Sequence, residues 1–403
     1  MVIVQKFGGT SVGDLDRIQN VANRVAKTLQ EGHQVVVVVS AMSGETNKLV
    51  SYAEHFSETP ERAEVDMLLS SGERVTAALL SIALNEMGHK ATSMTGRRAG
   101  IVTDDKHTKA RIDSIDATPI KSALEQGQVV VVAGFQGINK EGRVTTLGRG
   151  GSDLSAVAVA GAIGADLCEI YTDVDGIYTT DPRIEPKAKK LDKISYEEML
   201  ELASLGAKVL QNRSVEMAKK LNVNLVTRSS FSDAEGTLIT KEENIMEQPL
   251  VSGVALDRNQ ARVSLIGVAD RPGIAAEIFN TLAKDEINVD VILQTVAHDG
   301  TTNIDFTVPT NELGNARSIV KSFEDRDEIR SSDFNESIAK VSIVGVGMKS
   351  HAGVAAKAFS TMAEENINIR MISTSEIKVS MVIEEKYAEL AVRSLHNAFE
   401  LDK

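Results

Sequence analysis

Glycine-rich turns with charged neighbours are the clearest chemical feature of this sequence. The run Lys6–Ser11 (KFGGTS) stands where a β-rich stretch ends and a helical stretch begins. Paired glycines let a backbone come close to an anion, and the N–H groups at a helix start favour negative charge. Lys6 adds a point charge that suits phosphate oxygens. A Gly-Gly turn is also an ordinary loop, so this run needs support from elsewhere in the chain.

The run Leu147–Asp153 (LGRGGSD) repeats this arrangement before another helical stretch. Arg149 offers a planar fork of N–H donors that can hold a carboxylate. Asp153 belongs either to the same site or only to the helix N-cap. A third run, Thr172–Arg183 (TDVDGIYTTDPR), follows a β-rich stretch, and its tyrosine and arginine suit a nucleotide. The sequence has no Walker motif and no full Gly-x-Gly-x-x-Gly pattern, which disfavours P-loop and Rossmann proteins.

These turns lie among β-rich and helix-periodic stretches that alternate along the first part of the chain. The alternation predicts an α/β fold, with an open, mostly parallel sheet sandwiched by helices. We expect strands at Val2–Phe7, Gln34–Ser40, Gln128–Gly134, Leu167–Tyr171 and Asn224–Thr227. We expect helices at Leu15–Leu29, Ala63–Met87, Asp153–Ile163, Ser195–Ala203 and Lys208–Leu221. Together they predict a first domain over residues 1–245.

A polar linker over residues 241–248 ends at Pro249, and the chain beyond it repeats itself. The repeat has a spacing of about 80 residues, which is long enough for one small module. The matching segments are VSLIGV at 263–268 with VSIVGV at 341–346, GIAA at 273–276 with GVAA at 353–356, and INV at 287–289 with INI at 367–369. Two related modules are therefore expected.

Each repeat predicts a strand, a helix that starts at glycine, two strands and a second helix on an antiparallel sheet. The second helices are expected at Glu312–Glu324 and Tyr387–Phe399. The first repeat has a closing strand at Ile329–Phe334, but the second has none before the sequence ends. The strand-like run Leu250–Leu256 is the best donor, which interlocks two βαββαβ modules. The inserted first module would span 262–336, and the second would combine 249–261 with 337–403.

Composition narrows the function classes. A chain of 403 residues needs more than one domain. Its formal charge of −13 disfavours nucleic-acid and anionic-membrane binding and favours a small-molecule substrate. We expect a cytoplasmic protein without a membrane span, because the start of the chain has no signal-peptide pattern and its apolar run Val35–Val39 is too short. Cys168 is more consistent with the core than with a reactive thiol, and the scattered histidines show no zinc spacing.

Four signatures in order resemble the aspartate kinase branch of the amino-acid kinase family. They are Lys6–Ser11, Leu69–Arg74 (LSSGER), Gly148–Asp153 and Thr172–Arg183. The repeat resembles that branch's tandem ACT regulatory modules, so the resemblance covers essentially the whole chain. It implies an ATP:aspartate phosphotransferase that makes 4-phospho-L-aspartate, the first step toward lysine, threonine and methionine.

The resemblance also assigns roles to individual positions. It places the candidate catalytic groups at Lys6, Arg149 and Asp153. ATP would be held by Lys6, Phe7, Gly8, Gly9, Thr172, Asp173, Tyr178, Arg183 and Lys208. Aspartate would be held by Ser40, Thr46, Glu73, Arg149, Gly150, Gly151, Ser152 and Asp153, with Glu73 suited to the ammonium. Mg²⁺ would be held mainly by the ATP phosphates, and no protein metal site is expected.

Regulation is expected in the two modules. An amino-acid effector has a carboxylate that suits a helix start and an ammonium that suits acidic or carbonyl oxygens. The expected effector residues are Asp270, Ile274, Ala275, Asn288, Val289, Asp290, Gln294, Val354, Ala355, Asn368, Ile369 and Ser375. Lysine, threonine or both remain open as effectors. The resemblance also implies a homo-oligomer through the modules and, as in related enzymes, a shorter subunit that starts at Met246.

Other functions fit parts of the sequence. A kinase for another acidic amino acid, such as glutamate or acetylglutamate, would use similar glycine turns. A silent amino-acid sensor would need only the repeat, although it would have no need for Lys6, Arg149 and Asp153. The chain also departs from the branch where a His-Pro pair is frequent after Lys208–Leu210, because it has Gln211 and Asn212 there.

Overall fold

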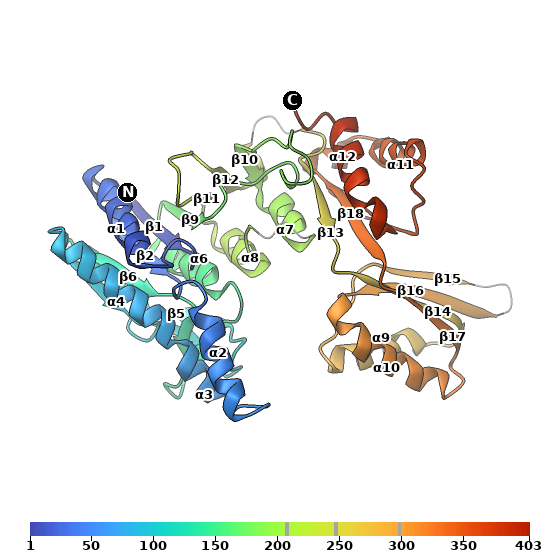
Figure 1. The fold of residues 1–403 in the computed structure, drawn as a ribbon, viewed down its shortest axis with the longest axis horizontal. Helices are drawn as coiled ribbons and strands as arrows, with labels where there is room; N and C mark the ends of the chain where they lie inside the picture. Colours follow the sequence, from blue (N-terminus) through green and yellow to red (C-terminus); the bar gives the residue numbers. More distant parts are fainter. Residues whose placement is uncertain (206–208, 246–248, 297–299) are drawn as a thin grey trace. The chain divides into compact units, whose positions relative to one another are not determined.

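The computed structural model describes residues 1–205, 209–245, 249–296 and 300–403 (Figure 1). The chain forms two compact units, each of which has its own sheets. The first unit consists of Met1–Ile177, Lys190–Ala203 and Lys208–Met246. The second consists of Tyr178–Lys189, Ser204–Ala207 and Glu247–Lys403. The short segment Tyr178–Lys189 therefore belongs to the unit formed mainly by the end of the chain.

An eight-stranded sheet organises the first unit, with the strand order β10-β12-β11-β9-β1-β2-β6-β3. Neighbouring strands run parallel except for the pair β11 and β12. The expected open, mostly parallel sheet is confirmed. Its strands are β1 (Val2–Phe7), β2 (Gln34–Val39), β3 (Ala91–Met94), β6 (Val129–Ala133), β9 (Leu167–Thr172), β10 (Lys193–Ser195), β11 (Leu225–Ser229) and β12 (Thr237–Thr240).

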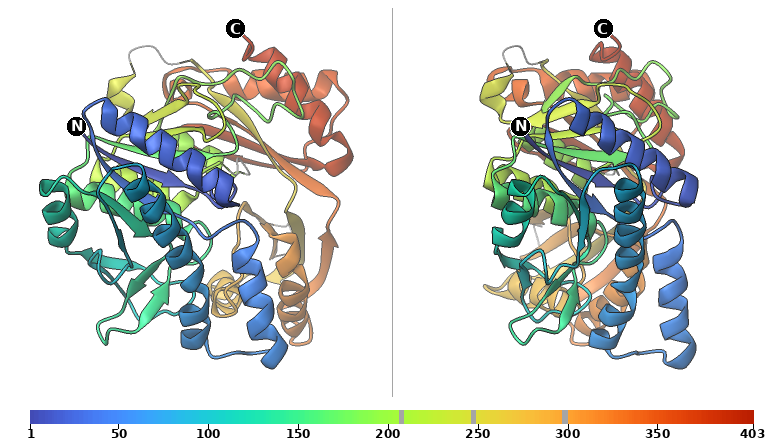
Figure 2. Two further views of the ribbon diagram at one scale, coloured as in Figure 1. Left: turned by 60° about the vertical axis from the view of Figure 1, so that its left-hand side comes forward. Right: turned by 90° about the vertical axis from the view of Figure 1, so that its left-hand side faces the viewer.

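Helices α1 and α4 cover this sheet, because each presents an apolar stripe to its buried valines. Residues of α1 and α4 pack with Val35, Val37 and Val39 of β2 in one core cluster. Helix α6 contacts β1, β2 and β9, and it also packs on α8. Figure 2 shows α1 beside the strands in two further views. The helices are α1 (Leu15–Gln30), α2 (Glu45–Phe56), α3 (Arg62–Leu69), α4 (Ser71–Glu86), α5 (Thr118–Glu125), α6 (Gly151–Ile163), α7 (Tyr196–Ser204) and α8 (Asn212–Leu221).

A small second sheet in this unit was not expected from the sequence. Its order is β5-β4-β7-β8, from β4 (Ile101–Thr103), β5 (Ile112–Ile115), β7 (Gln136–Ile138) and β8 (Val144–Thr146). These strands are three or four residues long, so they give little periodicity in the sequence. Strand β8 leads directly into the glycine turn at Gly148–Gly151.

The single helix expected over Ala63–Met87 is wrong, because two helices meet at Ser70. The carbonyl of Ser70 accepts a hydrogen bond from Gln136 Nε2 at 2.9 Å, which ties this junction to β7. The whole stretch Arg62–Glu86 is long and apolar enough to cross a membrane by length and composition alone. Half of its most apolar window is buried inside the protein.

The second unit contains two modules of the expected element order. The first has a sheet of order β15-β16-β14-β17 and the second a sheet of order β13-β18-β20-β19. The first module comprises β14 (Ala261–Ala269), α9 (Ile274–Lys284), β15 (Ile292–Val296), β16 (Thr301–Val308), α10 (Leu313–Glu324) and β17 (Ile329–Asn335). The second comprises β13 (Gly253–Asp257), β18 (Ile338–Val344), α11 (Val354–Glu364), β19 (Met371–Thr374), β20 (Lys378–Glu384) and α12 (Ala388–Ala398).

Strand β13 precedes the first module in the sequence but pairs antiparallel with β18 of the second. It takes the place next to β18 that β17 takes next to β14. The interlocked βαββαβ fold is therefore confirmed. Val291 of the first module also shares a small core with Ile338 and Met371 of the second.

The segment Tyr178–Lys189 is fixed within the second unit by hydrogen bonds of Thr179. The Val254 N–H of β13 donates to the Thr179 carbonyl at 2.7 Å. The Thr179 hydroxyl lies 2.9 Å from Nε2 of His396 in α12 and accepts the Lys189 N–H at 3.0 Å. This hydroxyl donates to the imidazole or accepts from it, according to the tautomer of His396. Burial lowers the pKa of His396, which favours a neutral ring.

Candidate active site

The candidate residues gather at the carboxyl edge of the large sheet. Register aligns Phe7 with Val39 and with Tyr171, and it aligns Val39 with Ala133. The residues that leave these strands are therefore neighbours, since parallel strands end at one edge. They include Gly8 after β1, Ser40 after β2, Gly134 after β6 and, one place later, Asp173 after β9. Open α/β sheets bind their ligands at this edge.

Lys6 and Asp153 form a nearly buried ion pair at this edge. The Lys6 Nζ lies 2.6 Å from Asp153 Oδ1, and the two side chains are 11% and 12% exposed. Lys6 comes from β1, and Asp153 comes from the first turn of α6, which packs on that strand. Asp153 thus orients the lysine, and it is not the helix N-cap, because that position is Gly150. The ammonium also lies 3.3 Å from where a Cβ on Gly8 would be, which puts it against the first glycine turn.

Glu73 is a buried acid with one unused oxygen. It lies in the first turn of α4 and is only 3% exposed. The Ala41 N–H donates to its Oε1 at 3.1 Å, while its Oε2 has no hydrogen-bond partner among the residues that the structure describes. Burial raises the pKa of Glu73 to about 7, against the smaller lowering effect of backbone hydrogen bonds. A cationic ligand group would satisfy this oxygen and favour the ionised form.

The second glycine turn is held by two side chains, Gln211 just before α8 and Arg213 within α8. Gly150 adopts φ 72°, and a Cβ there would lie 2.7 Å from Gln211, so this position favours glycine. Gln211 Nε2 donates to the carbonyl of Arg149. Arg213 donates to the carbonyls of Leu147 at 2.7 Å and Ala110 at 2.9 Å. The turn is rigid while the Arg149 side chain is exposed, which leaves its guanidinium available to a ligand.

Three other residues expected to hold aspartate lie at this edge or next to it. The Ser40 N–H donates to the Phe7 carbonyl at 3.1 Å. Ser152 is buried, and its hydroxyl lies 3.0 Å from the position of a Cβ on Gly134. Thr46 is half-buried in α2, a helix that begins five residues after Ser40. Ser40 and Ser152 thus belong to the strand edge itself, while Thr46 stands on the adjoining helix.

The nucleotide candidates divide between the two units. Phe7 is fully buried and stacks on Tyr171 with 4.6 Å between ring centroids, so only its backbone can face a ligand. Thr172 and Asp173 follow from this edge, and the Thr172 hydroxyl donates to Asp173 at 3.0 Å. Tyr178 and Arg183 belong to the second unit. Arg183 is exposed and pairs with Asp181 at 2.6 Å. Lys208 lies outside the described residues.

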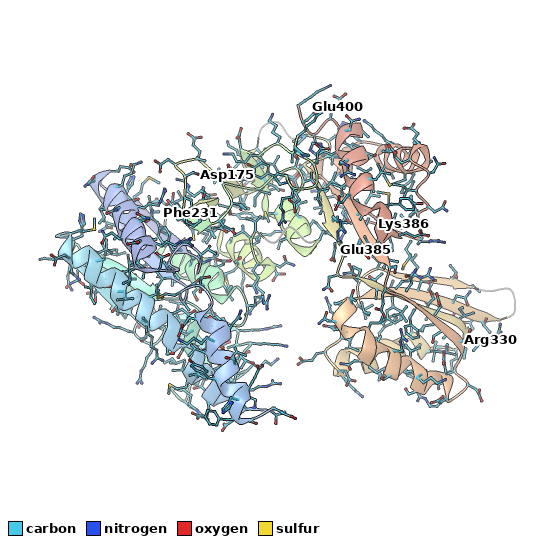
Figure 3. All side chains as sticks on the ribbon, in the orientation of Figure 1. Asp175, Phe231, Arg330, Glu385, Lys386 and Glu400 are labelled. Atoms are coloured by element: carbon cyan, nitrogen blue, oxygen red, sulfur yellow. The ribbon has the colours of Figure 1, made fainter. Side chains whose placement is uncertain are left out.

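A hollow of about 400 Å³ beside the first glycine turn was missed by the sequence analysis. Arg17, Arg24 and Lys27 of α1 line it, and Asp233, which also lines it, pairs with Arg24 at 3.3 Å. Ser11 and Phe231 are further lining residues. Phe231 is more than half exposed (Figure 3), with the Arg17 guanidinium 5.3 Å from its ring centre. The helical periodicity of α1 places these cations on its polar face, but nothing in the sequence distinguishes a binding face from an ordinary solvated one.

The expected effector positions occupy equivalent places in the two modules. Ile274 at the start of α9 shares a core with Val289, and Val354 at the start of α11 shares a core with Ile369. The exposed positions are Asp270, Asn288, Asp290, Gln294, Asn368 and Ser375, while Ala275 and Ala355 are half-buried. The carboxylate of Asp290 contacts Lys340, a lysine that is 3% exposed in β18. Asp290 thus already has a cation as its partner.

Two further expectations concern cysteine and metal. Cys168 is fully buried in β9, and burial raises its thiol pKa, which confirms the inert core cysteine. Within the described ranges, no group of three or more His, Cys, Asp or Glu side chains is placed to hold a metal ion.

Comparisons with known proteins agree along the chain. Residues 1–228 match the amino acid kinase family, and residues 263–327 and 341–399 each match an ACT domain. The chain is 59% identical to an aspartokinase of Helicobacter pylori strain J99, over the full length of both. Two solved structures of Escherichia coli aspartokinase III also match, each over 99% of both chains. The complex with aspartate and ADP (R-state) has 29% identity and a TM-score of 0.82, and the complex with lysine and aspartate (T-state) has 28% and 0.78.

The chain therefore belongs to the amino acid kinase family. Within that family it is an enzyme of the aspartokinase type, with a kinase domain followed by two ACT domains.

Proposed function

We propose that the chain transfers the γ-phosphate of ATP to the side-chain carboxylate of L-aspartate and makes 4-phospho-L-aspartate, the first step toward lysine, threonine and methionine. The observation that supports this proposal best is that one sheet edge carries both a lysine suited to phosphate and a buried acid suited to an ammonium group. Lys6 stands there beside a glycine turn, and Glu73 keeps an unused buried oxygen. The E. coli relative that binds aspartate and ADP covers the same length of chain.

The reaction requires positioning and charge neutralisation more than proton transfer. One oxygen of the aspartate carboxylate, ionised at neutral pH, bonds to the γ-phosphorus as the bond to the bridging oxygen of ADP breaks. Lys6, Gly8 and Gly9 would hold the phosphates through one ammonium and backbone N–H groups. Thr172, Asp173, Tyr178, Arg183 and Lys208 would hold the rest of ATP. Asp153 would orient Lys6, because the two already form an ion pair.

L-aspartate, the phosphoryl acceptor, would be held by one acidic and one basic side chain. Glu73 Oε2 would accept from its ammonium and Arg149 would grip a carboxylate. Ser40, Thr46, Gly150, Gly151 and Ser152 would complete this subsite. Mg²⁺ would neutralise the phosphates and be held mainly by them, since the described residues form no metal cluster.

A coupled assay of ADP release tests the proposed activity. ADP release should depend on aspartate, with glutamate and a no-substrate control giving the background rate. Equal rates with glutamate would favour a kinase for another acidic amino acid. No release with any acceptor would favour a sensor without kinase activity.

Replacing Arg149 with alanine should act mainly through aspartate. We expect KM for aspartate to rise by about tenfold or more, the loss typical of one charge-assisted contact, and KM for ATP to change little. Steady-state kinetics with each substrate varied in turn measures the split. Arg97→Ala, at another exposed arginine, is the control and should resemble the parent. An equal rise in both KM values would contradict the acceptor role.

We further propose feedback inhibition by lysine, threonine or both at the ACT domains. The effector would shift the balance between two states of the enzyme. Its carboxylate would meet the N–H groups at the starts of α9 and α11, and its ammonium would meet Asp270 or the carbonyl oxygens of Asn288 and Gln294. The lysine-bound T-state structure of the E. coli relative supports this class of ligand.

The variants Asp270→Ala and Gln294→Ala should weaken this inhibition. Uninhibited kcat should stay within about twofold, because distant sites act independently. Inhibition curves with lysine, threonine and methionine, alone and in pairs, would also identify the effector. Thr295→Ala, next to Gln294 on β15, is the control. Unchanged sensitivity of both variants, or a loss of basal activity in step with inhibition, would show that the pocket lies elsewhere.

The domains would span 1–245, 262–336 and the combined segments 249–261 and 337–403. Subunits would associate through their ACT domains in the cytoplasm. Met246 lies outside the described residues, but it stands just before the regulatory part and could start a shorter subunit. Blotting the native gene product with a C-terminal tag tests this idea, since a second band of roughly 17 kDa is expected from the chain fraction. A single full-length band would exclude it.

A further inference from the structure

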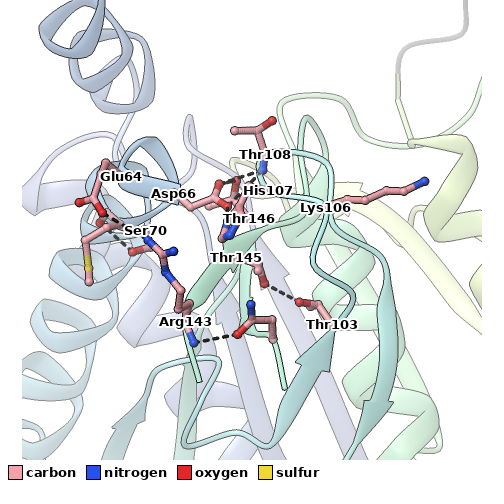
Figure 4. A network of polar contacts seen from close by, with 12 residues as sticks. Glu64, Asp66, Ser70, Thr103, Lys106, His107, Thr108, Arg143, Thr145 and Thr146 are labelled. Atoms are coloured by element: carbon pink, nitrogen blue, oxygen red, sulfur yellow. Dashed lines mark hydrogen bonds and ion pairs between the residues drawn. The ribbon is translucent and has the colours of Figure 1, made fainter. Parts of the chain in front are cut away.

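Helix α3 carries a fully buried carboxylate whose partners come from two distant segments. Asp66 has no exposed surface. Its Oδ2 lies 2.6 Å from Nδ1 of His107, and the Thr108 N–H donates to the carboxylate at 3.1 Å. The hydroxyl of Thr146 donates to Oδ1. Figure 4 shows His107, Thr108 and Thr146 converging on Asp66.

Two of these partners adjoin the second glycine turn. Thr146 is the last residue of β8, and its carbonyl accepts the Ala110 N–H at 2.9 Å. The carbonyl oxygen of Thr108 lies 3.1 Å from the place of a Cβ on Gly148, whose φ is 78°. Asp66 is therefore linked to the start of the turn through Thr146, two residues before Gly148, and through Thr108, whose carbonyl packs against Gly148.

The chemistry of this position requires a carboxylate. Three donors converge on Asp66, and a carboxylate has enough lone pairs for all of them. An amide would offer one oxygen and would turn its own N–H donors toward the remaining partners. Burying a charge is costly, so a residue needed only to fill space would be apolar. The position is thus specialised for gathering three donors.

We propose that Asp66 is a positioning residue for the acceptor turn, the segment Gly148–Gly151. It fixes Thr108 and Thr146, and these fix the direction in which the turn presents Arg149. A shift of about 1 Å in such a turn can lower catalytic efficiency by up to 100-fold. This inference rests on the proposed function, because the acceptor role of Arg149 belongs to that proposal.

Substitutions that remove the Thr146 hydroxyl or the Asp66 carboxylate test the inference. In Asp66→Asn and Thr146→Val we expect kcat/KM for aspartate to fall by about tenfold or more, because the turn is displaced. KM for ATP should stay within about twofold of the parent, since Lys6 and its glycines lie on another strand. Thr146→Ser keeps the hydroxyl and should retain most of the parent's efficiency. Asp113→Asn, at an exposed carboxylate of β5, is the matched control.

The following results would decide whether Asp66 positions the acceptor turn. Unchanged aspartate kinetics in both variants, or equal losses toward ATP and aspartate, would overturn the positioning role. If Asp66→Asn does not fold, the pair Thr146→Val and Thr146→Ser gives the same comparison. If the parent shows no aspartate-dependent ADP release, the proposed function fails instead. Amide hydrogen exchange over residues 147–151 then tests the positioning role without an activity assay, and exchange in Asp66→Asn and Thr146→Val no faster than in the parent would overturn the inference.

Discussion

Replacing Lys6 with alanine is expected to lower kcat by about 100-fold or more, the scale of losing one preorganised charge contact. Lys6 is 11% exposed on its side chain and is held by Asp153 at 2.6 Å, so its ammonium occupies one fixed place. Because it is oriented before substrate arrives, little reorganisation is needed when charge spreads over the transferred phosphoryl group. Its loss would remove that stabilisation and leave Asp153 without its cation.

The measurement is steady-state ADP release at saturating ATP and aspartate, together with circular dichroism. Lys140→Ala, at an exposed lysine beyond β7, is the control and should match the parent. Since Asp153 is left nearly buried and unpaired, Lys6→Ala should also unfold at a lower temperature. A near-normal kcat with a normal circular dichroism spectrum would rule out the phosphate role.

Replacing Glu73 with glutamine is expected to lower kcat/KM for aspartate by about 10- to 100-fold, the range for a hydrogen bond between charged groups. The parent should also lose efficiency as pH falls through about 7, since the pKa of buried Glu73 is raised to that value. The protonated acid cannot form an ion pair with an ammonium, so kcat/KM for aspartate should fall by nearly tenfold for each pH unit below this value. The glutamine variant should lack this step.

The same pKa has the opposite consequence for stability. The folded chain holds the Glu73 proton more tightly than the unfolded chain, whose value is near 4.5. The free energy of unfolding should therefore fall as pH rises from 4.5 through about 7, and this slope should be absent from Glu73→Gln. Glu86→Gln, at an exposed acid of the same helix, is the control. Matching pH profiles for the parent and Glu73→Gln would show that another group titrates.

The long and strongly periodic elements were predictable from the sequence. Strand β1 and helix α1 match expectation within one residue. The missing strand of the second repeat pointed to Leu250–Leu256, and β13 at Gly253–Asp257 pairs with β18. The break at Ser70 was not predicted, and the hydrogen bond that its carbonyl accepts comes from Gln136, 66 residues away. Helix α8 begins at Asn212, after the expected start, because Gln211 is extended.

The candidate site was predictable where chemistry and local structure coincide. Lys6, Gly8 and Asp153 stand at strand ends and helix starts, so parallel pairing brings them to one edge. Asp66 was not predictable, because its donors come from positions 41, 42 and 80 residues away. A helical aspartate with such partners is indistinguishable in the sequence from a solvated one. Only the fold shows that it is buried.

The packing of Tyr178–Lys189 bears on how far the enzyme can be divided. This segment is encoded between kinase strands, yet Thr179 bonds to Val254 and His396, and Ile184 packs in the core of the second ACT domain. A fragment cut at residue 245 would keep Lys6, Glu73 and Arg149 but would strip those partners from the segment. We therefore expect the segment to exchange its amide hydrogens faster in such a fragment than in the full chain, because the boundary in the sequence does not coincide with the boundary between the two compact units.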